Sequence, residues 1–360
     1  MRRILTTGSL WAIDRFALVL SAAIVQVVVA RKLGPENFGT LSYLLALITM
    51  ALPFSRMGLT GLLVKNLLER PDVETLILRA ALTWRLLGVL TAGVIALVGG
   101  SGAIAALLIL AMLGTALQLA EHSAQARSAP LEIVPIRLAI TLIGAVTKIA
   151  VASATANPLL VAWIFAAEYA AQGAAQWFAL SRYRGFFLRP TLDQEWSGYF
   201  VTRAPWLVIS EAMSMLYHRI DIVMLERLRG PAEAGIYATA ARLSEVWYAV
   251  PQLVMVALFP VLWQLRERES RWREGIQATA DALFWTAFGV ALATQFLAQP
   301  LVMVLFGAEY REAAPILALH IWAGLFVFMR ALVSRWLIAE DLIRLSLWSH
   351  GAGALTNVLL

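Results

Sequence analysis

The sequence predicts an all-α polytopic membrane protein of two six-helix lobes, because its composition, its apolar runs and one repeated motif agree. Of the 360 residues, 60% are hydrophobic and 14% are charged, and the mean hydropathy is +0.74. Soluble domains are nearer half apolar and a quarter charged. The composition therefore argues against a water-soluble enzyme, a disordered chain or a fibrous protein, and it makes lipid the main solvent.

Eleven apolar runs are long enough to cross a bilayer, which takes a helix of roughly 20 residues. Turn-forming residues separate them, as at Gly34-Pro35, Asn157-Pro158 and Gly230-Pro231. Transmembrane β-strands would be about 10 residues long and alternate in polarity, which these runs do not. The predicted spans are residues 8–30, 40–62, 80–99, 103–122, 138–156, 159–181, 202–226, 236–263, 279–304, 314–338 and 343–360.

The connection after the second span is expected to lie on the membrane surface. Residues 64–79 are rich in leucine and carry several charged residues, which is typical of a short interfacial helix. The apolar side chains expected to face lipid there are Leu67, Leu68, Leu76, Ile77 and Leu78.

The basic residues predict a cytoplasmic N-terminus. With that orientation, the outer connections hold only Arg31, Lys32, Arg227, Arg229 and Arg311. The inner connections hold about three times as many lysines and arginines, as the positive-inside rule requires. The net charge of +6 is therefore explained without a nucleic-acid partner.

A GPxxxG motif occurs twice, at Gly34–Gly39 and at Gly230–Gly235, a displacement of 196 residues from Gly34 to Gly230. Trp11 and Trp206 precede the two copies at nearly the same displacement, and Pro53 and Pro251 follow them. This order predicts two homologous halves, related as parallel repeats about an axis along the membrane normal.

The predicted N-terminal lobe is residues 1–195, with six helices and a basic linker at residues 182–195. The predicted C-terminal lobe is residues 196–360, with five helices. Because the sequence stops within an apolar run, we expect this lobe to be incomplete and its last helix to be truncated.

Ionisable residues inside the apolar runs are the main functional signal, because each costs several kcal/mol, by order of magnitude, if it faces lipid. At about 100° per residue, Arg203, Glu211, His218 and Asp221 share one face of a helix. Arg242 and Glu245 can pair within one helix, and Asp14 and Arg203 could pair between repeat-related helices. The alternative to a water-filled cavity is that these charges are ion pairs that hold helices together.

We favour a cavity between the halves. Its candidate substrate-binding residues are Arg15, Arg56, Arg203, Arg219 and Arg242, and its candidate charge-pair or ion-coupling residues are Asp14, Glu211, Asp221 and Glu245. Arginine suits phosphate because its planar fork donates two parallel hydrogen bonds. Arg85, Glu121 and Arg335 lie near predicted helix ends, where their charged groups can reach the interface.

The sequence gives no sign of an enzyme, a cofactor or a metal site. It contains no GxxxxGK[ST] loop, no HExxH pattern and no cysteine. The four histidines, His122, His218, His320 and His350, lie in different segments, and no long loop could hold a catalytic domain.

Three segments resemble the polysaccharide flippases, or O-antigen transporters, of the multidrug/oligosaccharidyl-lipid/polysaccharide (MOP) superfamily. They are Ala30–Gly39 with Ser42-Tyr43, then Gly235–Glu245, and then Phe306–Pro315. The resemblance implies two MATE-like six-helix lobes around a central cavity. It also implies a substrate, an undecaprenyl-diphosphate-linked oligosaccharide, that a monomer moves across the bacterial inner membrane by alternating access. By position, Arg15, Arg203, Arg219 and Arg242 would meet the diphosphate or acidic sugars.

Two other functions stay open at this point. The first is a cation-coupled multidrug or small-molecule antiporter of the same superfamily, which acid-rich cavities would favour. The second is a membrane glycosyltransferase or polymerase, which would need a long outer loop with paired acidic residues. For the flippase, proton or sodium coupling through Asp14, Glu211 or Asp221 is an open question, and a polysaccharide polymerase and glycosyltransferases are the expected protein partners.

Overall fold

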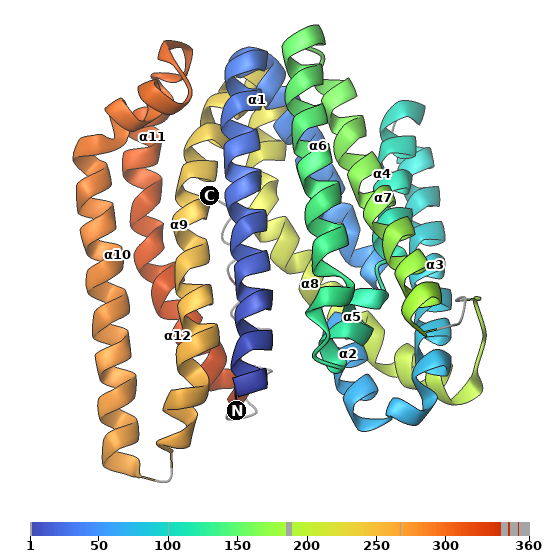
Figure 1. The fold of residues 1–360 in the computed structure, drawn as a ribbon. Coiled ribbons are helices and arrows are strands. Elements are labelled where there is room, and N and C mark those ends of the chain that lie inside the picture. The colour runs from blue at the N-terminus through green and yellow to red at the C-terminus, as the bar shows by residue number, and fades with distance from the viewer. Residues whose placement is uncertain are drawn as a thin grey trace.

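The structure is a computed structural model that describes residues 2–99, 101–184, 189–266 and 268–339, together with residues 345 and 352. Within these residues every regular element is a helix, and the helices stand side by side as a bundle (Figure 1). The predicted all-helical architecture is confirmed. Of the predicted span at residues 343–360, only Leu345 and Ala352 are among the described residues.

The first part of the bundle has seven α-helices and two short 3₁₀ helices, at Pro71–Val73 and Pro130–Glu132. The α-helices are α1 (Arg2–Arg56), α2 (Thr60–Glu69), α3 (Glu74–Gly99), α4 (Gly102–Ala116), α5 (Ala120–Ala126), α6 (Val134–Thr155) and α7 (Pro158–Arg184).

Up to residue 339, the described residues of the second part form five α-helices and two further 3₁₀ helices, at Ala308–Tyr310 and Ile321–Ala323. The α-helices are α8 (Gln194–Arg229), α9 (Pro231–Gln264), α10 (Glu269–Leu305), α11 (Ala313–His320) and α12 (Gly324–Ala339). In Figure 1, α9–α12 lie on the left and α3–α7 on the right, with α1 between them.

By length and composition, six helical stretches of the described residues could cross a membrane. They are Phe16–Glu69, Pro71–Val98, Gly102–Ala126, Val134–Thr155, Glu269–Leu305 and Ala313–Leu337. The first stretch contains the predicted span 40–62 and most of the predicted span 8–30. Helices α7, α8 and α9 have 27, 36 and 34 residues, which is also enough to span at 1.5 Å per residue.

The predicted breaks at the two GPxxxG motifs are sharp turns at single glycines. In α1 the helix changes direction at Gly34, which has φ 73° and ψ 169°. Gly230 has nearly the same conformation, with φ 95° and ψ 171°, between α8 and α9. Glycine adopts positive φ without a steric penalty, and the proline that follows is preorganised to begin the next helix. The gaps between the predicted spans on either side of each motif are therefore largely helical.

The predicted surface helix is only partly correct. Helix α2 exists, and Leu68 is exposed, but Leu67, Ile77 and Leu78 are buried. They belong to a core cluster that also contains Leu119 of the α4–α5 connection and Phe200 of α8. The side chains of Leu67, Ile77 and Leu78 therefore point into the protein interior, because α5 and α8 cover the helix face that was predicted to meet lipid.

The packing differs between the two ends of the bundle. At the end that carries the GPxxxG motifs, which we call the motif end, one core contains residues of α1, α4, α6 and α7 together with α8–α11. At the other end, one core is made by α2, α3, α5 and the start of α8. A separate core is made there by α9, α10 and α12. The two sides of the bundle thus share a core at the motif end and have separate cores at the opposite end.

Candidate functional site

The two GPxxxG motifs contact each other directly at the motif end. A Cβ atom placed on Gly39 would overlap the carbonyl oxygen of Pro231, and one on Gly235 would overlap the carbonyl oxygen of Pro35. The contact is therefore reciprocal, with equivalent residues of the two motifs exchanging roles. A twofold relation between two repeats would produce such a contact, although the repeat relation between the lobes stays a prediction.

Buried aromatic residues lie beside this contact between the two motifs, and we call the contact together with them the seam. The hydroxyl of Tyr310 donates a hydrogen bond of 2.8 Å to the carbonyl oxygen of Ala30, and its ring centre is 6.3 Å from that of Phe38. Burial raises the pKa of Tyr310, so the hydroxyl keeps the proton that it donates. The connection between α10 and α11 is thus tied to α1 beside the first motif.

A charged cluster joins α8 and α9 near the middle of the bundle. Arg219 of α8 lies 2.8 Å from Oε1 of Glu245, and Arg242 of α9 lies 3.1 Å from Oε2 of the same carboxylate. The predicted pair between Arg242 and Glu245 is confirmed. Two guanidinium groups share one carboxylate, so this cluster of three residues, the Arg219–Glu245–Arg242 cluster, carries a net positive charge.

Asp221 and Glu211 have partners of different kinds. The hydroxyl of Tyr237 donates a hydrogen bond to Oδ2 of Asp221, which links α8 to α9 again. Glu211 instead forms an ion pair of 3.2 Å with Arg56, at the C-terminal end of α1. That ion pair connects the predicted N-terminal lobe to the predicted C-terminal lobe, and both of its side chains are partly exposed.

A pocket of about 250 Å³ lies beside the Arg219–Glu245–Arg242 cluster, between α1 and α9. Its walls are mostly apolar, with Arg242, Glu245 and Gln26 as the polar exceptions. The pocket lining residues are Val19, Ala22, Ala23, Gln26, Val27, Arg242, Leu243, Glu245, Val246, Ala249 and Phe306. This arrangement suits a ligand that has both a charged group and an apolar part.

The predicted partner of Asp14 is wrong. Asp14 is buried and binds Arg137 of α6, and Arg137 also lies 2.8 Å from Glu121 of α5. Arg203, expected to face Asp14, is exposed, and its guanidinium carbon is 4.1 Å from the ring centre of Tyr199. The reason is the position of α6, which lies against α1 and brings a third helix to Asp14.

The other candidates on the first helix and on α8 can be placed only in part. The side chain of Arg15 lies outside the described part of the structure. His218 is exposed, and its Nδ1 is 2.7 Å from the carbonyl oxygen of Ser214 in its own helix. The residues predicted to share one face of α8 therefore do not form one site, because they contact different neighbours.

A polar cavity that the sequence did not indicate lies among the helices of the predicted N-terminal lobe. This cavity of about 360 Å³ is lined by Arg56, Arg85 and Arg137, with Glu121 and His122 among the other polar residues. Arg85 is fully enclosed; it bonds the carbonyl oxygen of Gln118 at 3.2 Å and Nε2 of His122 at 2.9 Å. We had placed Arg85 near a helix end because the span was predicted to begin at residue 80, whereas α3 begins at Glu74.

Within the part of the chain that the structure describes, no group of three or more His, Cys, Asp and Glu side chains is placed to hold a metal ion. The arginine, carboxylate and amide groups of these pockets can form ion pairs and hydrogen bonds with a ligand.

Residues 28–315 match the protein family described as "Polysaccharide biosynthesis protein". The chain belongs to this family. The match includes both GPxxxG motifs, the Arg219–Glu245–Arg242 cluster and the seam around Tyr310. No curated protein sequence matches the chain.

Two solved structures are similar to this member of the family in fold. One is the crystal structure of the eukaryotic MATE transporter AtDTX14, with a TM-score of 0.52 and 13% sequence identity. It covers 93% of this chain, and 83% of its own length is matched. The other, described only as protein A, has a TM-score of 0.50 and 14% identity, with 99% of this chain and 93% of its own covered. The chain therefore has the fold of a MATE transporter and is a multi-pass membrane protein.

Proposed function

We propose that this protein is a flippase that moves a polyprenyl-diphosphate-linked oligosaccharide across the bacterial inner membrane by alternating access. The observation that carries the proposal is the Arg219–Glu245–Arg242 cluster beside the pocket between α1 and α9. The two guanidinium groups share the carboxylate of Glu245, and Asp221 is a second carboxylate close to Arg242. Nε of Arg242 is enclosed without a partner among the described residues. A diphosphate group would accept hydrogen bonds from both guanidinium groups, which planar arginine forks suit.

The apolar walls of this pocket support a lipid-linked substrate over a fully soluble one. The polyprenyl chain can stay in lipid while the head group enters between the lobes, so only the polar part needs to be shielded from hydrocarbon. Membership of a polysaccharide biosynthesis family supports a sugar as the cargo. The undecaprenyl carrier and an O-antigen, capsule or exopolysaccharide repeat unit are the specific form of this proposal.

The packing supports alternating access with the motif end closed. Helices α9 and α10 share a core with the N-terminal helices at the motif end. At the other end α9, α10 and α12 form a core of their own, whereas α8 packs with α2, α3 and α5. With the predicted cytoplasmic N-terminus, this conformation would face inward. Opening outward would require the Gly39 and Gly235 contacts to separate, and α9, α10 and α12 to close toward α2, α3 and α5 at the opposite end.

A transport assay with defined lipid tests the proposal. The double variant R219Q/R242Q is placed in liposomes with fluorescent undecaprenyl-diphosphate oligosaccharide, and translocation is followed by loss of access to an external quencher. We expect transport at least about tenfold slower, because each lost charged hydrogen bond is worth about 1.5–3 kcal/mol.

The matched control is R273Q, because Arg273 is exposed and, among the described residues, its ion pair is with Glu269 of its own helix, at 2.7 Å. Its transport rate should equal that of the unchanged protein. If R219Q/R242Q is stably inserted and transports the lipid at the normal rate, the assignment is wrong.

The fold of a MATE transporter supports a second candidate, a cation-coupled antiporter of small molecules. Under that function, liposomes with an imposed sodium or proton gradient would accumulate a fluorescent cationic drug, and the lipid-linked oligosaccharide would stay in its leaflet. The same liposomes therefore separate the two functions.

A further inference from the structure

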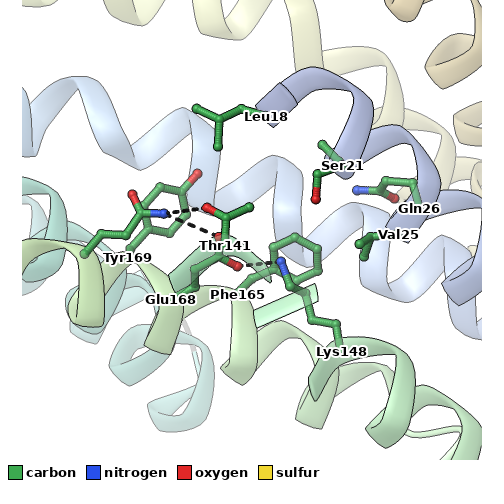
Figure 2. A pocket seen from close by; sticks show the side chains of 11 residues that line it. Leu18, Ser21, Val25, Gln26, Thr141, Lys148, Phe165, Glu168 and Tyr169 are labelled. Atoms are coloured by element: carbon green, nitrogen blue, oxygen red, sulfur yellow. Dashed lines mark hydrogen bonds and ion pairs between the residues drawn. The ribbon is translucent and has the colours of Figure 1, made fainter. Parts of the chain in front are cut away.

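A second pocket lies among helices of the predicted N-terminal lobe (Figure 2). It has a volume of about 210 Å³ and is formed by α1, α6 and α7. We call it the α1–α6–α7 pocket. Ala22 and Gln26 of α1 line both this pocket and the one beside the Arg219–Glu245–Arg242 cluster. The two pockets are therefore neighbours on adjacent faces of α1.

The charges in the α1–α6–α7 pocket cancel. Nζ of Lys148 on α6 lies 2.5 Å from Oε2 of Glu168 on α7, and both side chains are largely enclosed. The ammonium is also 4.0 Å from the ring centre of Phe165. Gly144 leaves the space that this carboxylate occupies, since a Cβ atom there would lie 2.6 Å from Oε2. The pocket thus contains a pre-formed neutral pair and no uncompensated charge among its described lining residues.

Hydrogen-bonding groups of both kinds surround this pair. Nε2 of Gln172 donates to Oγ1 of Thr141 at 3.2 Å and to Oε1 of Glu168 at 3.4 Å, as the dashed lines in Figure 2 show. Oε1 of Gln26 is enclosed and accepts no hydrogen bond from any residue that the structure describes. The hydroxyl of Ser21 also lines the pocket. Donors and acceptors therefore alternate around a small space.

The remaining wall is aromatic and aliphatic, with Phe165, Tyr169, Leu18 and Val25. A sugar ring has the matching surface, because its hydroxyl groups each donate and accept and its C–H faces pack on aromatic rings. A phosphate or carboxylate ligand would meet the carboxylate of Glu168, and a metal ion would meet the ammonium of Lys148. An acyl chain would leave the polar groups without partners.

We propose that the α1–α6–α7 pocket binds one neutral sugar residue of the transported glycan. This inference rests on the proposed flippase function and assigns the sugar to a different place from the diphosphate. The adjoining polar cavity shares Leu18, Tyr169 and Gln172 with the pocket and extends to Arg56. Because Arg56 pairs with Glu211 of α8, that cavity gives the glycan a polar route from between the lobes.

The test measures binding of free sugars to the full chain in lipid nanodiscs by saturation-transfer NMR, which detects weak ligands. The probes are methyl glucoside and methyl N-acetylglucosaminide as neutral sugars, with glucuronate and inorganic phosphate as anions. We expect saturable binding of a neutral sugar that neither anion displaces. In Q172M and in Q26M, which keep the side-chain length and lose its hydrogen bonds, the dissociation constant should rise about fivefold or more.

Q299M is the matched control, because Gln299 is exposed on α10 and lines none of these pockets. E168Q is a second probe: it removes the negative charge beside Lys148 and should make the pocket gain affinity for glucuronate. The proposal is overturned if no neutral sugar binds saturably, if phosphate competes in the unchanged protein, or if Q172M and Q26M bind as Q299M does. If transport of the lipid-linked oligosaccharide is normal and any of these results is obtained, the sugar-binding role of the pocket is refuted and the proposed flippase function is not.

Discussion

The two predicted lobes use their buried polar residues in different ways. In the part of the chain that the structure describes, the buried Asp, Glu, Arg, Lys and His side chains all lie within residues 1–195. They are Asp14, Glu74, Arg85, His122, Arg137 and Lys148. In the described residues 196–339, the buried polar side chains are hydroxyls, such as Thr239 and Ser244, each of which bonds a carbonyl of its own helix.

The Arg219–Glu245–Arg242 cluster of the predicted second lobe is instead partly exposed, and Arg242 and Glu245 line a pocket with α1. The side chains of Arg219, Arg242 and Glu245 are 16%, 19% and 32% exposed, whereas those of Asp14 and Arg137 are 0% and 5% exposed. Charge in an apolar helix can thus hold a lobe together or line a pocket, and composition alone does not distinguish the two uses. We expect the first group to matter for stability and the second for transport.

The largest effect is expected from Arg137→Ala. The substitution leaves Asp14 buried without its partner and removes the pair with Glu121. Breaking a buried ion pair by removing one partner costs about 3–5 kcal/mol. The free energy of unfolding in mixed detergent micelles should fall by that amount, and a loss below about 1 kcal/mol would contradict the view that this group holds the lobe together.

Gly39→Ala tests the core at the motif end, where the two GPxxxG motifs meet. The new methyl group would overlap the carbonyl oxygen of Pro231, and overpacking of this kind costs about 1–3 kcal/mol. The thermal unfolding midpoint should fall. Gly289→Ala in α10 is the control, because nothing lies within 4 Å of its Cβ position and alanine favours the helix. Equal unfolding midpoints for the two variants would mean that the backbone at the contact between Gly39 and Pro231 shifts to accommodate the methyl group.

Phe328→Ala tests the apolar core of the second lobe. Phe328 is buried with Met255, Leu283 and Leu332. In lipid the transfer free energy from water is missing, so the cost comes from the lost packing and the cavity, about 2 kcal/mol. The same unfolding measurement checks this value. A cost as large as that of Arg137→Ala would remove the contrast between a polar and an apolar interior.

The smallest effect on stability is expected from Arg242→Gln. Glu245 keeps Arg219 as a partner, and the site is partly exposed, so we expect a loss below about 1 kcal/mol. Transport of the lipid-linked oligosaccharide should nevertheless be reduced. Both the free energy of unfolding and the transport rate should be measured on one protein preparation. A large loss of stability would mean that Arg242 stabilises the fold, as Asp14 and Arg137 do.

The membrane architecture was predictable because it depends on local properties. Apolar runs of sufficient length, interrupted by Gly-Pro pairs, indicated the helices, and the turns at Gly34 and Gly230 are where the pattern placed them. The pair of Arg242 and Glu245 was also predictable, because three residues along a helix bring side chains together in any fold. The start of one predicted span was misplaced at residue 80, whereas α3 begins at Glu74, so Arg85 was taken to lie near a helix end.

The partners of the other charges could not be predicted in this way. Helical periodicity shows which residues share a face, but it does not show which helix that face meets. Asp14 binds Arg137, 123 residues away, and Arg56 binds Glu211, 155 residues away. Sequence spacing suggested Arg203 as the partner of Asp14, and the position of α6 against α1 decided otherwise.

Bilayer thickness and backbone geometry act on short segments, so a bundle of membrane helices with two similarly placed Gly-Pro turns could be predicted from local sequence. Only the folded chain shows that the two motifs meet each other, that one set of charges is buried among the N-terminal helices and that another lines a pocket. Those outcomes depend on which helices come into contact, and contacts between distant segments are a property of the folded chain.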